Sequence, residues 1–215
     1  MTDLLESWHA QAAVNPARVV LADLGDPRAD DAAARLTADG LVDVVAPVLD
    51  RADAGILATA DAAVRQGLDP DDPVVAAAIL VRAGMADAAV AGATRPSADV
   101  LRAGLNVLGV APGVGVVSSS ILFVLRDGRV IAYGDCGVVP DPDEVQLASI
   151  AVSTARTFET LSGESARVAM LSFSTRGSAR HARVDKVRNA TALVGDLAPD
   201  LVVDGELQFD AAWVP

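Results

Sequence analysis

Cysteine and aromatic residues are scarce in this sequence. It holds one cysteine, Cys136, among 215 residues, so no disulfide can form within the chain, and we expect a reducing, cytoplasmic setting. Aromatic residues make up 3%, so the core must be built from Ala, Val, Leu and Ile. A catalytic thiol needs a nearby histidine, and only His9 and His181 exist. We therefore interpret Cys136 as a packing residue in preference to a nucleophile, and His181 as a loop residue in preference to a base.

Long apolar runs and net positive charge are also missing. No uncharged apolar stretch reaches the length of about 18 residues that a membrane span needs, and we expect no signal peptide in the first residues, which carry acids and no continuous apolar run. A net charge of −12 argues against a general nucleic-acid or anionic-membrane surface. The acidic runs around 69–73 and 141–144 carry no His or Cys spacing for a metal, so we expect no metal site and interpret them as helix caps.

Along the chain, segments whose apolar residues follow a helical period alternate with short β-rich runs. A period of 3.6 predicts helices over 2–14, 26–40, 71–85, 97–108, 141–161 and 184–197, and β-rich runs predict strands over 18–21, 42–49, 86–93, 166–173 and 201–207. We expect the strand at 86–93 to be buried and Ser97 to be the N-cap of the helix that follows. This alternation predicts an α/β fold with parallel strands.

One antiparallel hairpin interrupts the alternation. Two β-rich runs, 113–125 and 129–135, flank a tight turn at Asp127–Gly128. We place the domain junction at this hairpin, giving an N-terminal domain over 1–134 and a second domain over 135–215. The glycine-rich stretch 109–117 leads into a strand and lacks a nucleotide-binding motif, so we interpret it as a structural turn.

The stretch "LSFSTRGSARHARVDKV" concentrates local positive charge in an acidic chain. Five of the 17 cations fall between Arg176 and Arg188. The stretch follows a predicted strand and precedes a helix, a place where backbone N–H groups favour an anion. Hydroxyls, a flexible glycine and a guanidinium come together in Ser172, Ser174, Thr175, Arg176, Gly177 and Ser178, with Arg180 and Arg183 nearby. Two interpretations remain open: an anion site, or a solvated loop whose hydroxyls cap the helix.

Several segments, taken in order, resemble one family. "YGDCGVVPDPDEVQLASIAVSTARTF", "RVAMLSFSTRGSARHARVDKVRNAT" and "PDLVVDGELQFDAAWVP" are similar to successive motifs of the phosphate acetyl/butyryl transferase family. "LLESWHAQAAVNPARVVLADLGDPRADDAAARL" is similar to the family's opening, and "ADAAVAGATRPSADVLRAGLNVLGVAPGVGVVSS" to its middle. The resemblance covers nearly the whole chain.

The resemblance implies two α/β/α domains with an interdomain cleft, as in isocitrate and isopropylmalate dehydrogenase folds. It implies transfer of an acetyl or short acyl group between coenzyme A and phosphate, in a homodimer, with coenzyme A as a substrate and no cofactor. The loop 172–178 resembles the family's phosphate-binding segment, and Arg102, Ser118 and Asp135 are further cleft residues that the resemblance suggests.

The chain also departs from the family pattern. The family continues beyond "DAAWVP" into an "N-D-L-S-R-G" motif and an acid that supply its catalytic Ser, Arg and Asp, and this sequence contains none of them. We therefore expect a C-terminally truncated chain with both domains incomplete, no catalytic residue and little activity alone. The apolar stretches 74–85 and 90–93 would then be only partly covered. The alternative is a non-catalytic phosphate- or coenzyme A-binding or regulatory homologue.

Overall fold

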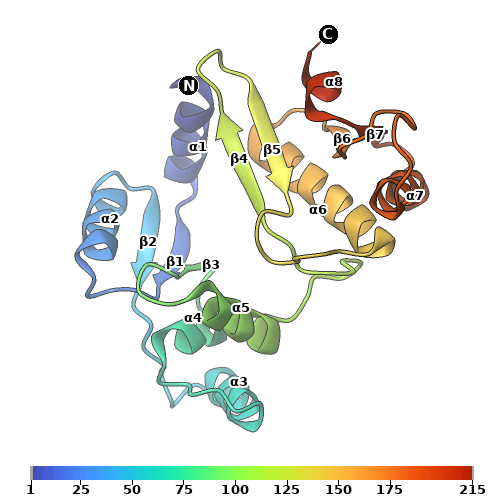
Figure 1. Ribbon diagram of the computed structural model, residues 1–215. Helices are drawn as coiled ribbons and strands as arrows, with labels where there is room; N and C mark the ends of the chain where they lie inside the picture. The colour runs from blue at the N-terminus through green and yellow to red at the C-terminus, as the bar shows by residue number, and fades with distance from the viewer. Residues whose placement is uncertain (1, 215) are drawn as a thin grey trace. The chain divides into compact units, whose positions relative to one another are not determined.

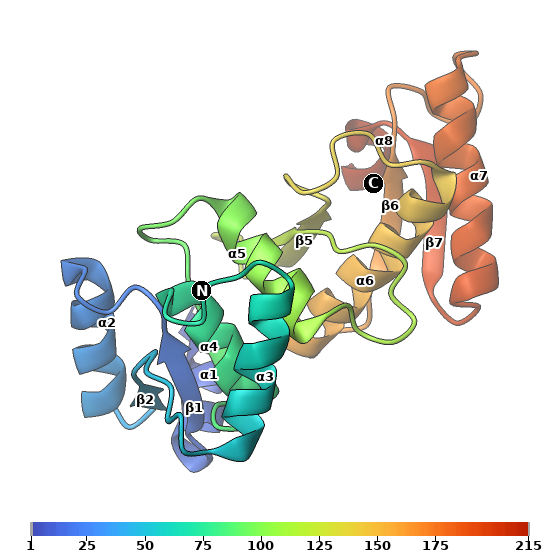
Figure 2. The same cartoon turned by 90° about the horizontal axis from the view of Figure 1, so that it is seen from below.

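The computed structural model describes residues 2–214, and the chain folds into two compact units, Thr2–Gly109 and Val110–Pro215. Each unit combines parallel strand pairs with helices, as the alternating pattern predicts, so the mixed α/β class is confirmed. The ribbon is drawn in Figure 1 and, turned by 90°, in Figure 2.

The first unit holds a three-stranded parallel sheet in the order β2-β1-β3. Its elements are α1 (Thr2–Val14), β1 (Ala17–Leu21), α2 (Pro27–Ala38), β2 (Val42–Val45), α3 (Ala54–Arg65), α4 (Pro73–Arg82), β3 (Ala88–Val90), α5 (Ser97–Ala103) and the π-helical turn η1 (Gly104–Leu108). The central strand sets the register, with Val19 opposite both Val44 and Ala88. Helix α4 packs against the sheet and the neighbouring helices, and its residues Val74–Leu80 are all buried.

Aspartates start three helices of this unit. Asp26, Asp53 and Asp72 each accept a hydrogen bond from a backbone N–H of the first turn, and Pro27 and Pro73 follow two of them. A carboxylate at the N-cap satisfies N–H groups that have no partner within the helix, and proline fits the first helical position. The interpretation of the acidic run around Asp72 as a cap is therefore confirmed.

Four expectations for the first unit differ from the structure, one of them in part. Residues 74–80 of the stretch 74–85 are covered, because this part of α4 lies in the core. Met85 at its end is 43% exposed and Val90 of the stretch 90–93 is 57% exposed, so these two residues are only partly covered, as expected. Strand β3 is exposed along all three residues instead of buried. Pro96, not Ser97, is the N-cap of α5, and its side chain makes no capping hydrogen bond. Helix α3 was not predicted, although its buried residues Ile56, Ala60 and Ala63 follow the spacing of one helix face.

The second unit holds two two-stranded sheets and the helices between them. Its elements are β4 (Ser120–Val124), β5 (Val130–Gly134), α6 (Glu144–Ser162), β6 (Arg167–Leu171), α7 (Ala182–Leu197), β7 (Val202–Leu207) and α8 (Phe209–Trp213). Strands β4 and β5 form the predicted antiparallel hairpin, and β6 pairs with β7 in parallel. Helices α6 and α7 pack through Ala148, Val152 and Ala190, small residues that let the two backbones approach closely.

The division between the units falls earlier than the sequence placed it. We expected a domain over 1–134 and another over 135–215, whereas the compact units divide at Gly109–Val110. The reason is that both strands of the hairpin pack against α6, so the hairpin belongs with the second unit.

Candidate functional site

The cationic loop lies where the sequence predicted, between β6 and α7. Strand β6 ends at Leu171, and His181 begins the helix as its N-cap, with its Nδ1 accepting a hydrogen bond from the N–H of Arg183 at 3.1 Å. The His181 ring also contacts Phe173 edge-on, with 5.7 Å between ring centroids. His181 therefore has a structural role at the helix start.

The tip of the loop is a tight turn built on two left-handed residues. Arg176 has a φ of 46° and Gly177 a φ of 79°. The N–H of Ser178 donates to the carbonyl of Thr175 at 3.1 Å, which closes the turn. The positive φ at the second position explains the glycine, because glycine adopts this conformation without steric cost.

The hydroxyls of the loop bind the loop itself. Ser174 is fully buried, and its Oγ accepts from the N–H of Ala179 at 3.0 Å and lies 3.2 Å from Ser178 Oγ. Ser172 Oγ accepts from the N–H of Ser174 at 3.3 Å. Thr175 Oγ1 accepts from the N–H of Gln208 at 2.8 Å, which ties the loop to the end of β7. These hydroxyls fix the shape of the loop instead of pointing as a set toward solvent.

The N–H groups of the loop are also used internally. Successive N–H groups of residues 174–179 donate to Ser172 Oγ, Ser178 Oγ, the Glu206 carbonyl, the Glu206 carboxylate, the Thr175 carbonyl and Ser174 Oγ. The sequence predicted that some of these groups would face an anion. In this structure these six N–H groups all have partners within the protein, whereas the guanidinium groups of Arg176 and Arg180 lie at the wall of a hollow.

Glu206 is the residue that the sequence analysis did not find. It lies in β7, is only 2% exposed, and accepts from the N–H of Gly177 at 2.6 Å, Ser174 Oγ at 3.3 Å and Arg188 Nε at 3.3 Å. The bond from Gly177 is the main reason why the pKa of Glu206 falls to about 2, and Arg188 adds to the effect against the opposing influence of burial. The carboxylate is therefore ionised at neutral pH.

A hollow of about 590 Å³ opens beside the loop. Three arginines and two acids line it, together with the backbone of small residues: Arg176, Arg180, Arg188, Asp185, Glu206, Gly177, Ala179 and Gly205. Arg176 pairs with Asp204 at 2.7 Å, and Arg188 pairs with Asp185 at 3.2 Å. Within residues 2–214, Arg180 makes no side-chain hydrogen bond or ion pair. Guanidinium groups around a solvent-open hollow suit an oxyanion such as phosphate.

Asp135 anchors the turn that follows β5. Its carboxylate accepts from the N–H and hydroxyl of Ser119 and from the N–H groups of Gly137, Val138 and Val139 at 2.5–3.1 Å. Burial, the largest influence, raises the pKa of Asp135, but these donors together hold it well below its usual range. A carboxylate with five donors positions the backbone, which is a structural role.

Two other residues that the resemblance suggested are Ser118 and Arg102. Ser118 is half-buried just before the hairpin, and the structure gives its hydroxyl no partner among the described residues. Arg102 belongs to α5 in the first unit and pairs with Asp99 at 3.0 Å. Cys136 is exposed, and its thiol donates to the carbonyl of Tyr133 at 3.2 Å.

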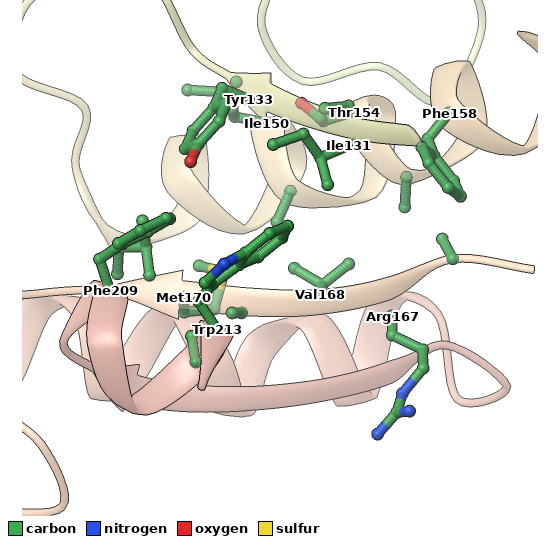
Figure 3. Close-up of a pocket in the computed structure, with 18 of the residues that line it drawn as sticks. Ile131, Tyr133, Ile150, Thr154, Phe158, Arg167, Val168, Met170, Phe209 and Trp213 are labelled. Carbon is green, nitrogen blue, oxygen red and sulfur yellow. The ribbon is translucent and has the colours of Figure 1, made fainter. Parts of the chain in front are cut away.

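A second hollow, of about 500 Å³, is apolar. It lies between β5 and β6, with α6 beside it and the aromatic rings of Phe209 and Trp213 at one end (Figure 3). The labelled residues show that β5 and β6 run in the same direction, since Ile131 and Tyr133 follow the same course as Val168 and Met170. Its lining is mostly apolar, and the polar side chains among the lining residues are those of Tyr133, Thr154, Glu164, Ser165 and Arg167.

Neither a metal cluster nor a membrane helix was found in the described part of the chain. In residues 2–214, no three His, Cys, Asp or Glu side chains come together as metal ligands. No helix in the same range has both the length and the apolar character to cross a bilayer.

Comparison with known proteins gives concordant results. Residues 55–215 match the family model described as phosphate acetyl/butaryl transferase. A phosphate acetyltransferase of Paracoccus denitrificans is 40% identical over 97% of this chain and 74% of its own length. Another, of Thermoanaerobacterium thermosaccharolyticum, is 45% identical over 66% of this chain and 45% of its own length.

Solved structures match as well. A phosphotransacetylase of Streptococcus pyogenes superposes with a TM-score of 0.89 at 31% identity, covering 100% of this chain and 75% of that one. The EutD phosphotransacetylase of Staphylococcus aureus gives 0.86 at 28% identity, with the same coverage. The similarity therefore extends over both units of this chain.

Proposed function

The chain belongs to the phosphate acetyl/butyryl transferase family, and we propose that it contributes the phosphate-binding part of an enzyme that converts acetyl-coenzyme A and phosphate into acetyl phosphate and coenzyme A. In the reverse direction the coenzyme A thiolate attacks the acetyl carbonyl and a C–S bond forms. The bond between the acetyl carbon and the bridging oxygen breaks, and that oxygen leaves with the phosphate. The protein's task at the phosphate is to neutralise the charge that grows on its oxygens.

The observation that carries the proposal is the arginine-lined hollow beside the loop 172–178. Arg176 and Arg180 present guanidinium groups at its wall, and the loop fixes the backbone that bears them. In this proposal the hydroxyls of Ser174 and Ser178 act by shaping the loop, and the guanidinium groups contact the substrate. Coenzyme A enters as a substrate, and no cofactor is required.

Finer features of the family are part of the same proposal. They are the isocitrate dehydrogenase-like pair of domains with an interdomain cleft, the contributions of Arg102, Ser118 and Asp135 to that cleft, a homodimer, and a cytoplasmic location. The sequence contains no "N-D-L-S-R-G" motif, so we expect the 215-residue chain to bind phosphate with little turnover of its own.

Titration with inorganic phosphate and with acetyl phosphate tests the proposal. Both ligands should bind saturably, and Arg176→Ala should weaken binding about ten-fold, the lower end expected for a charge-assisted bond, because this side chain is 72% exposed. Arg156→Ala is the matched control, since Arg156 is an exposed arginine of α6 in the same unit. Equal losses in both variants, or no saturable binding by the wild type, would overturn the proposal.

A coupled assay separates an enzyme from a binding protein. Release of coenzyme A from acetyl-coenzyme A in the presence of phosphate can be followed by the free thiol. Turnover by the chain at an ordinary enzyme rate of about 1–1000 per second would contradict the expectation of low activity. Binding of phosphate without any binding of acetyl-coenzyme A would favour a non-catalytic phosphate-binding homologue.

A further inference from the structure

The carboxylate of Glu206 lies at the point where the donors of the loop converge. It receives the Gly177 N–H, the Ser174 hydroxyl and one edge of the Arg188 guanidinium, and the carbonyl of the same residue receives the Arg176 N–H at 3.1 Å. Backbone N–H, hydroxyl and guanidinium donors are the set that an oxyanion prefers. A side chain of the protein thus fills a position suited to an external anion.

Glu206 is also a wall residue of the hollow. The space beside it is open, and Arg188 lies between the two acids that it pairs with, Asp185 and Glu206. An anion that enters the hollow meets guanidinium groups that carboxylates already partly neutralise, because Arg176 pairs with Asp204 in the same way.

We propose that Glu206 is a resident anion that competes with the substrate phosphate: it holds the loop donors and Arg188, so that phosphate binds through the outer guanidinium groups of Arg176 and Arg180 with limited affinity. This inference rests on the proposed function of the hollow and goes beyond it by naming a residue that sets the affinity. Glu206 is a positioning residue here, since it acts through Arg188 and through the charge of the wall.

A limit on phosphate affinity has a physical use. An enzyme gains no rate from binding a substrate and its transition state equally tightly, and a phosphate that is held too firmly leaves slowly as a product. A fixed carboxylate at the wall lowers the affinity for free phosphate without removing the arginines that stabilise developing charge.

Neutralising Glu206 without changing its shape tests the inference. In Glu206→Gln the amide oxygen can still accept from Gly177, whereas the negative charge and the pairing with Arg188 are lost. Inorganic phosphate, titrated calorimetrically at pH 7 and low ionic strength, should bind about three- to ten-fold more tightly, because one negative charge near the anion is removed. Glu164→Gln removes the same charge from an exposed position of the unit and serves as the control, with unchanged affinity expected.

A double-mutant cycle separates positioning from a general effect on the fold. Arg188→Gln should weaken phosphate binding little in the wild type, where Glu206 holds Arg188, and several-fold more in the Glu206→Gln background, where Arg188 is free to face the anion. A purely structural role of Glu206 predicts equal effects of Arg188→Gln in both backgrounds.

A second variant, Asp204→Asn, tests the inference independently in case Glu206→Gln does not fold. Asp204→Asn releases Arg176 at an exposed ion pair and should also tighten phosphate binding, by about two- to five-fold. If the wild type binds phosphate, and both folded variants bind phosphate no more tightly than the wild type does, the inference is overturned. If the wild type does not bind phosphate at all, the proposed function itself fails, and the two outcomes are therefore distinguishable.

Discussion

Thr94 donates two hydrogen bonds to one carboxylate oxygen of Asp23, from its N–H at 3.0 Å and from its hydroxyl at 2.5 Å. The other oxygen of Asp23 accepts from the N–H of Ala93 at 3.0 Å, and the side chain is almost fully buried. The chain after β1 is thereby tied to the chain after β3. The Thr94 hydroxyl is the main cause of a lowered pKa of Asp23.

Loss of this contact should destabilise the first unit. Asp23→Ala leaves three donors without a partner, and we expect a loss of about 2–4 kcal/mol in the free energy of unfolding. Asp31→Ala removes an exposed pair with Arg35 at 3.6 Å and should cost less than about 0.5 kcal/mol. Urea unfolding of both variants makes the comparison, and similar midpoints would contradict a structural role of Asp23.

A side chain at Gly205 should destabilise the second unit. A Cβ there would lie 2.6 Å from Met170 Cβ and 2.9 Å from the Met170 carbonyl oxygen, so the β6–β7 pair would have to separate. Gly205→Ala should cost about 1–3 kcal/mol. Gly195→Ala, in α7 with nothing within 4 Å, should instead stabilise by up to about 1 kcal/mol. Thermal unfolding should therefore shift in opposite directions for the two variants.

Stability of the second unit should fall at acid pH. The folded state lowers the pKa of Glu206 from 4.5 to about 2 and lowers that of Asp135 as well. Their contribution is complete above the unfolded-state pKa values and is lost as the pH falls from about 4.5 toward about 2. Asp135→Asn should reduce the slope of the unfolding free energy in this range, whereas Asp127→Asn, at an exposed turn, should change it less. Identical slopes for these two variants would count against the role of Asp135.

The left-handed turn at Gly177 should matter for phosphate binding. Gly177→Val forces a branched side chain onto a φ of 79°, which shifts the backbone that carries Arg176 and should weaken phosphate binding about three- to ten-fold. Gly163→Val imposes the same strain at a φ of 73° at the end of α6, away from the hollow. It should cost similar stability and leave the phosphate affinity unchanged. Equal affinities for both variants would mean that the loop conformation has no part in binding.

Local signals in the sequence predicted the elements that depend on near neighbours. Asp143 and Gln146 form a capping box that starts α6, and Asp127–Gly128 forms the hairpin turn, both within a few residues of chain. The buried face of α7, with Val184, Val187 and Val194, follows from its apolar period. The loop 172–178 was placed correctly between strand and helix for the same reason.

Contacts between distant residues could not be predicted in this way. No local pattern in the sequence distinguishes Glu206 from the other acidic residues of this chain. Its carboxylate contacts Gly177 only because β6 and β7 pair and bring the two residues together. Likewise, the residues around Asp135 predict only the end of a strand, and the hydrogen bond that its carboxylate accepts from Ser119, 16 residues earlier, is not evident from them. The exposure of β3 depends on what covers the edge of the sheet, and a short apolar run carries no information about that.

The two parallel strands that flank the apolar groove have a consequence for amide hydrogen exchange. Within residues 110–214, β5 hydrogen-bonds only to β4 and β6 only to β7, so each strand has one edge without a strand partner. Along each strand, amide protons that face the partner should exchange slowly with deuterated solvent, and those that face the groove should exchange quickly. The alternating pattern would disappear if another extended segment lay between β5 and β6, so exchange rates read out the occupancy of the groove directly.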